Sequence, residues 1–176
     1  MPARKISASH FSEDIRQFLE CLSAHDVEFI VVGGEAVIYH GYPRVTGDVD
    51  IFYRLSVVNA QRLFDALVSF WGGRVPGVRS PSSLGHDGII VQFGVPPHRI
   101  DLINRIDGVS FEDAWRGREQ AVLVGGKASM PLAYIGLDAL IKNKKAAGRP
   151  KDLDDLRYLR ATRANAKRQS AKRFLC

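Results

Sequence analysis

Cysteine is scarce in this chain of 176 residues, because Cys21 and Cys176 are the only two and no C-x-x-C spacing occurs. A disulfide framework is therefore excluded, and nothing indicates a zinc site. Long apolar runs are also absent, since no segment approaches the roughly 18 residues that cross a membrane. The N-terminus is basic but lacks the apolar stretch of a secretory signal. We therefore expect a cytoplasmic protein without membrane association.

The short motifs of several common enzyme classes are missing as well. The sequence contains no G-x-x-x-x-G-K-[ST] phosphate loop, no G-x-S-x-G nucleophile turn and no H-E-x-x-H zinc motif. Its five histidines show no spacing typical of metal ligands. These absences argue against P-loop NTPases, G-x-S-x-G hydrolases and H-E-x-x-H metalloproteases.

What is present is ordinary for a globular protein, with 45% hydrophobic and 25% charged residues. The length predicts a single domain over residues 1–176. The net charge of +6 is not evenly spread, because all 19 acidic residues lie at or before Asp155. The last 21 residues carry seven positive charges and no negative one. This segment either binds RNA or another phosphate-rich partner, or is a solvated helix end whose cations complement the helix dipole.

Hydrophobic periodicity predicts alternating helices and strands. Helical patterns cover residues 11–24, 35–40, 57–70, 111–115 and 132–145, followed by a last helix from about Asp152. Strand patterns cover residues 28–32, 49–53, 89–93, 99–104 and 121–124, the third and fourth forming a hairpin. The sequence therefore predicts the α/β (α+β) class: a mixed, twisted sheet flanked by helices. Its core spans about 27–125, with a C-terminal helical extension at about 131–165 and a basic tail at 166–176.

Three acidic residues lie within these apolar strand patterns. Asp48 and Asp50 are two apart on one strand, so both point to the same face, while Val49 and Ile51 point into the core. Asp101 lies between Ile100 and Leu102 on a later strand. If the two strands are neighbours, three carboxylates converge, which suits Mg²⁺ and two-metal chemistry at phosphorus.

Gly33 and Gly34 follow the strand at 28–32 and precede a helical segment. Glycines at such a junction allow backbone N–H groups to approach phosphate oxygens. Each element alone has a simpler interpretation, since a Gly-Gly pair is usually a turn and an Asp-x-Asp is usually solvated or ion-paired. Their order and spacing together favour a site for a metal and a nucleotide.

With these motifs the sequence resembles the nucleotidyltransferase superfamily that includes DNA polymerase β. It is most similar to the small bacterial branch related to AbiEii-type toxins and antibiotic nucleotidyltransferases. Two further stretches carry the resemblance: "RVTGDVD", with Arg44 and Thr46 ahead of the acids, and "KNKKAAGRPKDLDDLRYL". The resemblance covers roughly residues 27–160.

The resemblance implies a role for each matching residue. Asp48, Asp50 and Asp101 would be the catalytic acids that bind two Mg²⁺ ions, with Mn²⁺ as an alternative, and Asp101 is also a candidate base. The nucleotide-binding residues would be Gly33, Gly34, Arg44, Thr46, Lys144 (or Lys145), Arg149 and Lys151. Asp152 is a candidate helix N-cap and a candidate residue of the site, and the two roles can coexist.

The function that this resemblance implies is transfer of a nucleoside monophosphate from an NTP to a hydroxyl acceptor. The acceptor stays open between RNA (a tRNA end included), a small molecule and a protein. One alternative is a non-catalytic nucleotide-binding or toxin–antitoxin partner protein of the same fold, although all three acids are present. Another is a metal-dependent nuclease, in which the Gly-Gly pair has no evident purpose.

Overall fold

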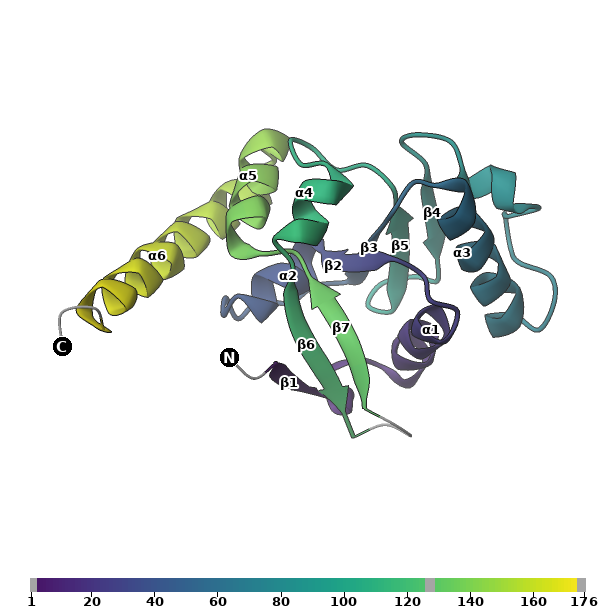
Figure 1. Ribbon diagram of the computed structural model, residues 1–176, viewed down its shortest axis with the longest axis horizontal. Helices are drawn as coiled ribbons and strands as arrows, with labels where there is room; N and C mark the ends of the chain where they lie inside the picture. The colour runs from purple at the N-terminus through teal and green to yellow at the C-terminus, as the bar shows by residue number, and fades with distance from the viewer. Residues whose placement is uncertain (1–2, 126–128, 174–176) are drawn as a thin grey trace.

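The computed structural model describes residues 3–125 and 129–173. Within these residues, seven strands form one mixed sheet in the order β1-β6-β7-β2-β3-β5-β4 (Figure 1). The strands are β1 (Arg4–Ser7), β2 (Phe29–Val32), β3 (Asp48–Tyr53), β4 (Ile90–Phe93), β5 (Arg99–Ile103), β6 (Glu119–Val124) and β7 (Met130–Tyr134). The helices are α1 (Glu13–Ala24), α2 (Gly33–Tyr39), α3 (Val57–Phe70), α4 (Phe111–Arg116), α5 (Leu137–Ala147) and α6 (Pro150–Arg173), with 3₁₀ helices η1 (Ala8–His10) and η2 (Pro81–Leu84).

Serine N-caps start three of the described α-helices. The Ser12 hydroxyl accepts a hydrogen bond from the Ile15 N–H at the start of α1. Ser56 and Ser110 cap α3 and α4 in the same way. Each cap satisfies one backbone N–H that has no partner within its helix.

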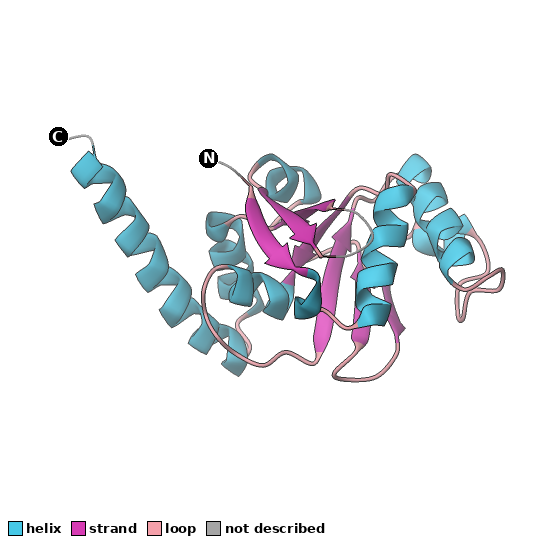
Figure 2. Cartoon of the chain, turned by 90° about the horizontal axis from the view of Figure 1, so that it is seen from below, coloured by secondary structure: helices cyan, strands magenta, loops and turns pink. Residues whose placement is uncertain are grey.

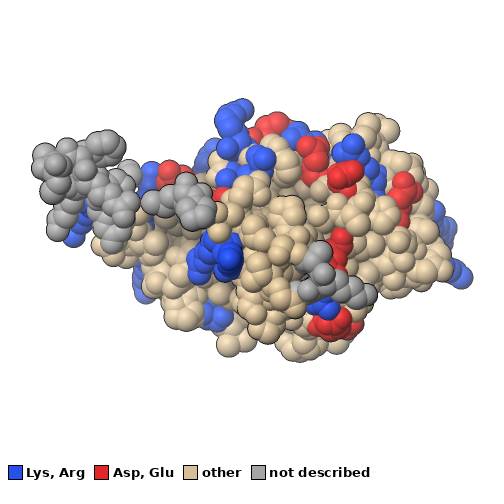
Figure 3. Space-filling view, turned by 60° about the horizontal axis from the view of Figure 1, so that its bottom comes forward, with Lys and Arg blue, Asp and Glu red and all other residues tan. Residues whose placement is uncertain are grey.

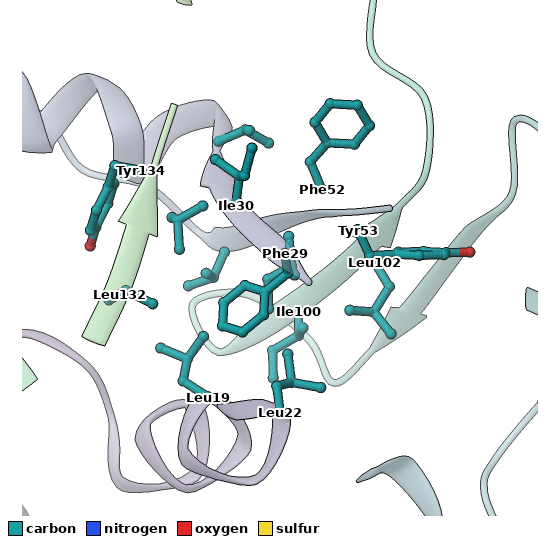
Figure 4. Packing of buried hydrophobic residues seen from close by; sticks show 14 of the residues in the cluster. Leu19, Leu22, Phe29, Ile30, Phe52, Tyr53, Ile100, Leu102, Leu132 and Tyr134 are labelled. Carbon is teal, nitrogen blue, oxygen red and sulfur yellow. The ribbon is translucent and has the colours of Figure 1, made fainter. Parts of the chain in front are cut away.

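The two faces of the central strands have different characters. Val49, Ile51 and Tyr53 of β3 are buried on the face that α1 covers, whereas the alternate residues of β3 point the other way. Figure 4 shows Leu19 and Leu22 of α1 below the sheet and Phe52 projecting from its opposite side. On that opposite side the Phe52 ring meets Phe111 of α4 edge-on, with ring centroids 5.1 Å apart.

Helices lie on both sides of the sheet (Figure 2). On the side of the acids, α2 packs against β3 and α5, and α5 packs against α6. The buried residues of α6 end at Leu159, and the rest of this helix projects beyond the sheet (Figures 1 and 2). The part of α6 up to Leu159 thus packs against the body of the protein, and the helix then extends away from it.

The structure confirms the predicted class, a mixed sheet flanked by helices with a C-terminal helical extension. One predicted element is wrong: residues 132–134 are not helical, because Met130–Tyr134 form β7 between β6 and β2. A short apolar run fits either element, and here pairing with β6 decides in favour of the strand. The next helix begins only at Leu137, after Gly136.

Smaller differences concern both ends of the chain. β1 was not predicted, since its residues are mostly exposed and carry no alternating apolar pattern. The last helix starts at Pro150 rather than Asp152, and on it Leu156 and Leu159 are buried whereas Leu153 is 51% exposed. Residues 174–176 of the basic tail lie outside the described residues. None of the helices described is long and apolar enough to cross a membrane.

Candidate active site

Strand pairing brings the three acids together. β3 and β5 are parallel neighbours, and their register places Asp50 directly beside Asp101. One carboxylate oxygen from each of Asp48, Asp50 and Asp101 lies within 4.8 Å of the other two. Asp101 is buried, while the other two are half-buried. The convergence that was conditional in the sequence is therefore present in the fold.

The paired glycines allow α2 to start against this cluster. Gly33 has a φ of +61°, and a Cβ there would lie 1.8 Å from Oδ2 of Asp50. A Cβ on Gly34 would lie 2.5 Å from Oγ1 of Thr46. The Thr46 hydroxyl donates a hydrogen bond of 3.1 Å to Oδ1 of Asp48. Both glycines therefore sit where no side chain fits without displacing the acids or their neighbours.

A cavity of about 280 Å³ opens over the cluster. Its walls contain all ten residues that the sequence singled out for catalysis or nucleotide binding: Gly33, Gly34, Arg44, Thr46, Asp48, Asp50, Asp101, Lys144, Arg149 and Lys151. Val45, Gly47 and Arg99 complete the lining. Lys145 is exposed and does not line this cavity, so Lys144 is the lysine of the pair that faces the acids.

Arg99 is a charged residue of this cavity that sequence reasoning missed. It precedes Asp101 by two positions on β5, so its side chain projects from the same face of the strand. Its Nε donates to Oδ1 of Asp101 at 2.9 Å, and its Nη2 lies 2.5 Å from Oδ2 of Asp48. The alternation rule that located the acids would also have located this cation.

Lys144 is enclosed by two other acids. Its ammonium is 2.7 Å from Oδ1 of Asp152 and 2.9 Å from Oδ2 of Asp155, and all three residues are at most 2% exposed. Arg149 donates from Nε to Oδ2 of Asp152 at 2.7 Å, and Arg44 Nε lies 3.3 Å from Oδ1 of Asp155. This network of five charges fastens α5 and the loop before β3 to the first two turns of α6.

Asp152 is not the N-cap of the last helix. It occupies the third position of α6, and its Oδ2 accepts a 3.3 Å hydrogen bond from the backbone N–H of Arg149. Burial alone would raise the pKa of Asp152, but the hydrogen bonds from Arg149 and Lys144 outweigh it and lower that pKa. Asp152 therefore stays ionised and neutralises the cations at the edge of the cavity.

Burial and the neighbouring carboxylates both disfavour the ionised form of Asp50. Burial, followed by the charges of Asp48 and Asp101, raises the pKa of Asp50 to about 6, against the opposing effect of Lys144 and Lys151. Among the described residues no side chain donates a hydrogen bond to Asp50. An arrangement of close carboxylates, one of them without a partner, attracts cations that accept oxygen ligands.

Comparison with known proteins identifies the family of the chain. No curated protein matches the chain. The sequence model of one family, described as nucleotidyl transferase of unknown function (DUF2204), matches residues 11–173. That match includes the paired glycines, the three carboxylates and the charge network at the start of α6. The chain therefore belongs to the DUF2204 family, within the nucleotidyltransferase superfamily.

Proposed function

We propose that this protein is a Mg²⁺-dependent nucleotidyltransferase that moves a nucleoside monophosphate from an NTP to a hydroxyl acceptor. The observation that carries the proposal is the position of Asp48, Asp50 and Asp101 within one cavity that also contains Gly33 and Gly34. Carboxylates alone would fit many metal sites. Carboxylates beside a glycine junction and several cations fit a metal together with phosphates.

The donor set suits the proposed ion. Three carboxylates, each able to supply an oxygen to one small region, fit Mg²⁺, or Mn²⁺ in its place, and two ions can share them. The bound metal would lower the pKa of the acceptor hydroxyl and neutralise the charge that develops on the α-phosphate. Asp101, the most buried of the three, is the candidate to receive the hydroxyl proton.

The other residues of the cavity act on the triphosphate. Backbone N–H groups at Gly33 and Gly34 contact phosphate oxygens, because no side chain separates them from the cavity. Arg149 and Lys151 line the wall formed by the start of α6 and bind the departing pyrophosphate. Lys144 contributes its charge to the same wall and holds α6 in place through Asp152. The acceptor oxygen bonds to the α-phosphorus as the bond to the pyrophosphate oxygen breaks.

α6 favours a polyanionic acceptor, and we propose RNA. Its 24 residues correspond to a length of about 36 Å at 1.5 Å per residue. Beyond Asp155 it contains no acid, and Arg157, Arg160, Arg163 and Arg168 follow one another along it. On the face in Figure 3, Lys and Arg surface is present on the half of the molecule that bears α6, while most Asp and Glu surface lies on the other half, together with further Lys and Arg surface. A phosphate backbone along this helix would lead to the cavity.

Label transfer tests the proposal. The protein is incubated with Mg²⁺ and each α-³²P-labelled NTP in turn, with total RNA, a small-molecule extract or a protein extract as acceptor. The Asp48→Asn variant serves as the blank, and Asp87→Asn, which changes an exposed acid paired with Arg105 outside the cavity, is the matched control. We expect label in the RNA fraction from wild type and the control, none from Asp48→Asn and none from γ-labelled NTP.

Other outcomes would identify other functions. Label in the small-molecule or protein fraction would keep the transferase and replace the acceptor. Binding of Mg²⁺ and NTP without transfer to any fraction would favour a non-catalytic partner protein in a toxin–antitoxin or sensing role. Cleavage of RNA without NTP would favour a nuclease. A transferase with these substrates would work in the cytoplasm, where Mg²⁺, NTPs and RNA are all present.

A further inference from the structure

Arg99 is fixed among the acids by strand register. In the parallel pairing of β3 and β5, Arg99 lies directly beside Asp48, just as Asp101 lies beside Asp50. The side chains of residues 99 and 101 leave β5 on the same face, because they are two positions apart. The register of the two strands therefore places a cationic side chain among the acids.

The guanidinium of Arg99 binds two of the three carboxylates at once. Nε and Nη2 hold Oδ1 and Oδ2 of Asp101 at 2.9 and 3.1 Å, and Nη2 also reaches Oδ2 of Asp48 at 2.5 Å. Arg99 thus engages both carboxylate oxygens of Asp101. Gln92 Nε2 donates a further hydrogen bond to Oδ2 at 3.2 Å. Asp50 alone has no such contact among the described residues.

These contacts conflict with metal binding. A Mg²⁺ or Mn²⁺ ion needs carboxylate oxygens as ligands, and it repels a guanidinium within a few ångströms. The ion and Arg99 therefore compete for the same oxygens of Asp48 and Asp101. The side chain of Arg99 is 29% exposed, so it can leave the carboxylates towards the cavity without disturbing the core.

We propose that Arg99 is an internal counter-cation of this cluster, which a metal ion displaces and which then binds the triphosphate. The inference rests on the proposed function, because it assigns both states to the same cavity. In the metal-free protein Arg99 neutralises Asp48 and Asp101. Once displaced, the guanidinium of Arg99 stays in the cavity that Gly33 and Gly34 also line. There it can donate paired hydrogen bonds to phosphate oxygens, as it did to the carboxylate of Asp101.

This exchange couples metal and nucleotide. A metal ion that binds alone must displace Arg99 and leaves it without an anionic partner, so its affinity is low. A metal that binds with a triphosphate provides that partner in the same step. Arg99 thus weakens the binding of metal alone and strengthens the binding of phosphate, two effects of opposite sign from a single side chain.

The test compares wild type with Arg99→Gln and Arg99→Lys. Mn²⁺ binding is followed by electron paramagnetic resonance, and binding of inorganic triphosphate in excess Mn²⁺ by calorimetry. We expect Arg99→Gln to bind Mn²⁺ alone about tenfold more tightly and triphosphate about tenfold more weakly. Arg99→Lys keeps the charge but loses the paired guanidinium donors, so both of its affinities should lie between those of wild type and Arg99→Gln. Arg105→Gln removes an exposed arginine near the end of β5 and should change neither value.

The results that overturn the inference are distinct from those that overturn the transferase. An unchanged or weaker Mn²⁺ affinity in Arg99→Gln would overturn the competition, and an unchanged triphosphate affinity would overturn the exchange. Either result leaves the label-transfer assay free to support the enzyme. Absence of Mn²⁺ binding from wild type and from every variant would overturn both.

Discussion

Lys144 provides the most direct test of how the cavity is held together. Its ammonium contacts Asp152 and Asp155, which are 0% and 1% exposed. Replacing it by methionine keeps a long apolar side chain and removes the charge, which leaves two buried carboxylates with one cation fewer. Breaking a buried ion pair from one side costs about 3–5 kcal/mol.

The contacts that remain place the expected loss near the lower end of that range. Arg149 still donates to Asp152 at 2.7 Å, and Arg44 remains 3.3 Å from Asp155. We therefore expect Lys144→Met to lose about 3 kcal/mol of unfolding free energy. In a domain of this size each kcal/mol corresponds to about 2–4 °C, so Tm should fall by about 6–12 °C.

Circular dichroism during thermal and urea unfolding measures this loss. Lys145→Met is the matched control, since Lys145 is adjacent and exposed, and it should change stability by less than about 0.5 kcal/mol. Adding Asp155→Asn to Lys144→Met removes a buried carboxylate that is left with Arg44 as its remaining cation, and should restore part of the stability. The reasoning would be refuted if Lys144→Met stayed within about 1 kcal/mol of wild type, or if Asp155→Asn destabilised it further.

Three other predictions concern the acids, the glycine junction and α6. Because the pKa of Asp50 is raised in the folded state to about 6, the unfolding free energy of the metal-free protein should fall by about 1–3 kcal/mol as pH rises from 4 to 8. Asp50→Asn removes that loss. In EDTA its unfolding free energy should therefore equal that of wild type near pH 4 and exceed it at pH 8. A difference in unfolding free energy that does not change with pH, measured by urea unfolding, would contradict this. Gly33→Ala and Gly72→Ala both put a side chain at a φ near +60°, so each should lose about 1–2 kcal/mol of unfolding free energy through backbone strain alone. Only at Gly33 does the new Cβ meet Asp50, whereas nothing lies within 4 Å at Gly72, so Mn²⁺ binding should fail only in Gly33→Ala; equal binding by the two variants would count against the geometry. The double variant Arg160→Ser/Arg168→Ser should weaken RNA binding and reduce the slope of log K against log salt by about 2; a filter-binding titration with an unchanged slope would remove α6 from the acceptor site.

The acids were predictable because one simple rule decides their orientation. Side chains alternate along a strand, so the apolar neighbours of Asp48, Asp50 and Asp101 assigned all three to one class of face. The sequence did not predict that β3 pairs with β5, because α3 and β4 lie between these two strands along the chain. The tertiary fold supplies that pairing.

The errors have equally specific causes. Residues 132–134 are apolar and follow a proline, a pattern that suits a buried helix start or a short strand, and only contact with β6 and β2 distinguishes the two. β1 is an exposed edge strand whose residues carry no period. The acidic partners of Lys144 could not be predicted, because they depend on the angle at which α6 packs against α5. The local sequence does not encode that angle.

The parallel register of β3 and β5 also has a consequence for synthesis of the chain. Asp50 and Asp101 are 51 positions apart, and they become neighbours only when the later strand has docked beside the earlier one. A nascent polypeptide that has emerged only as far as β4 already contains the paired glycines and two of the acids, but not the third. Such an intermediate should be unable to assemble the complete carboxylate cluster, so chemistry at this centre would begin only after long-range strand pairing. Metal retention could therefore report, during folding, the moment at which the sheet acquires its native register.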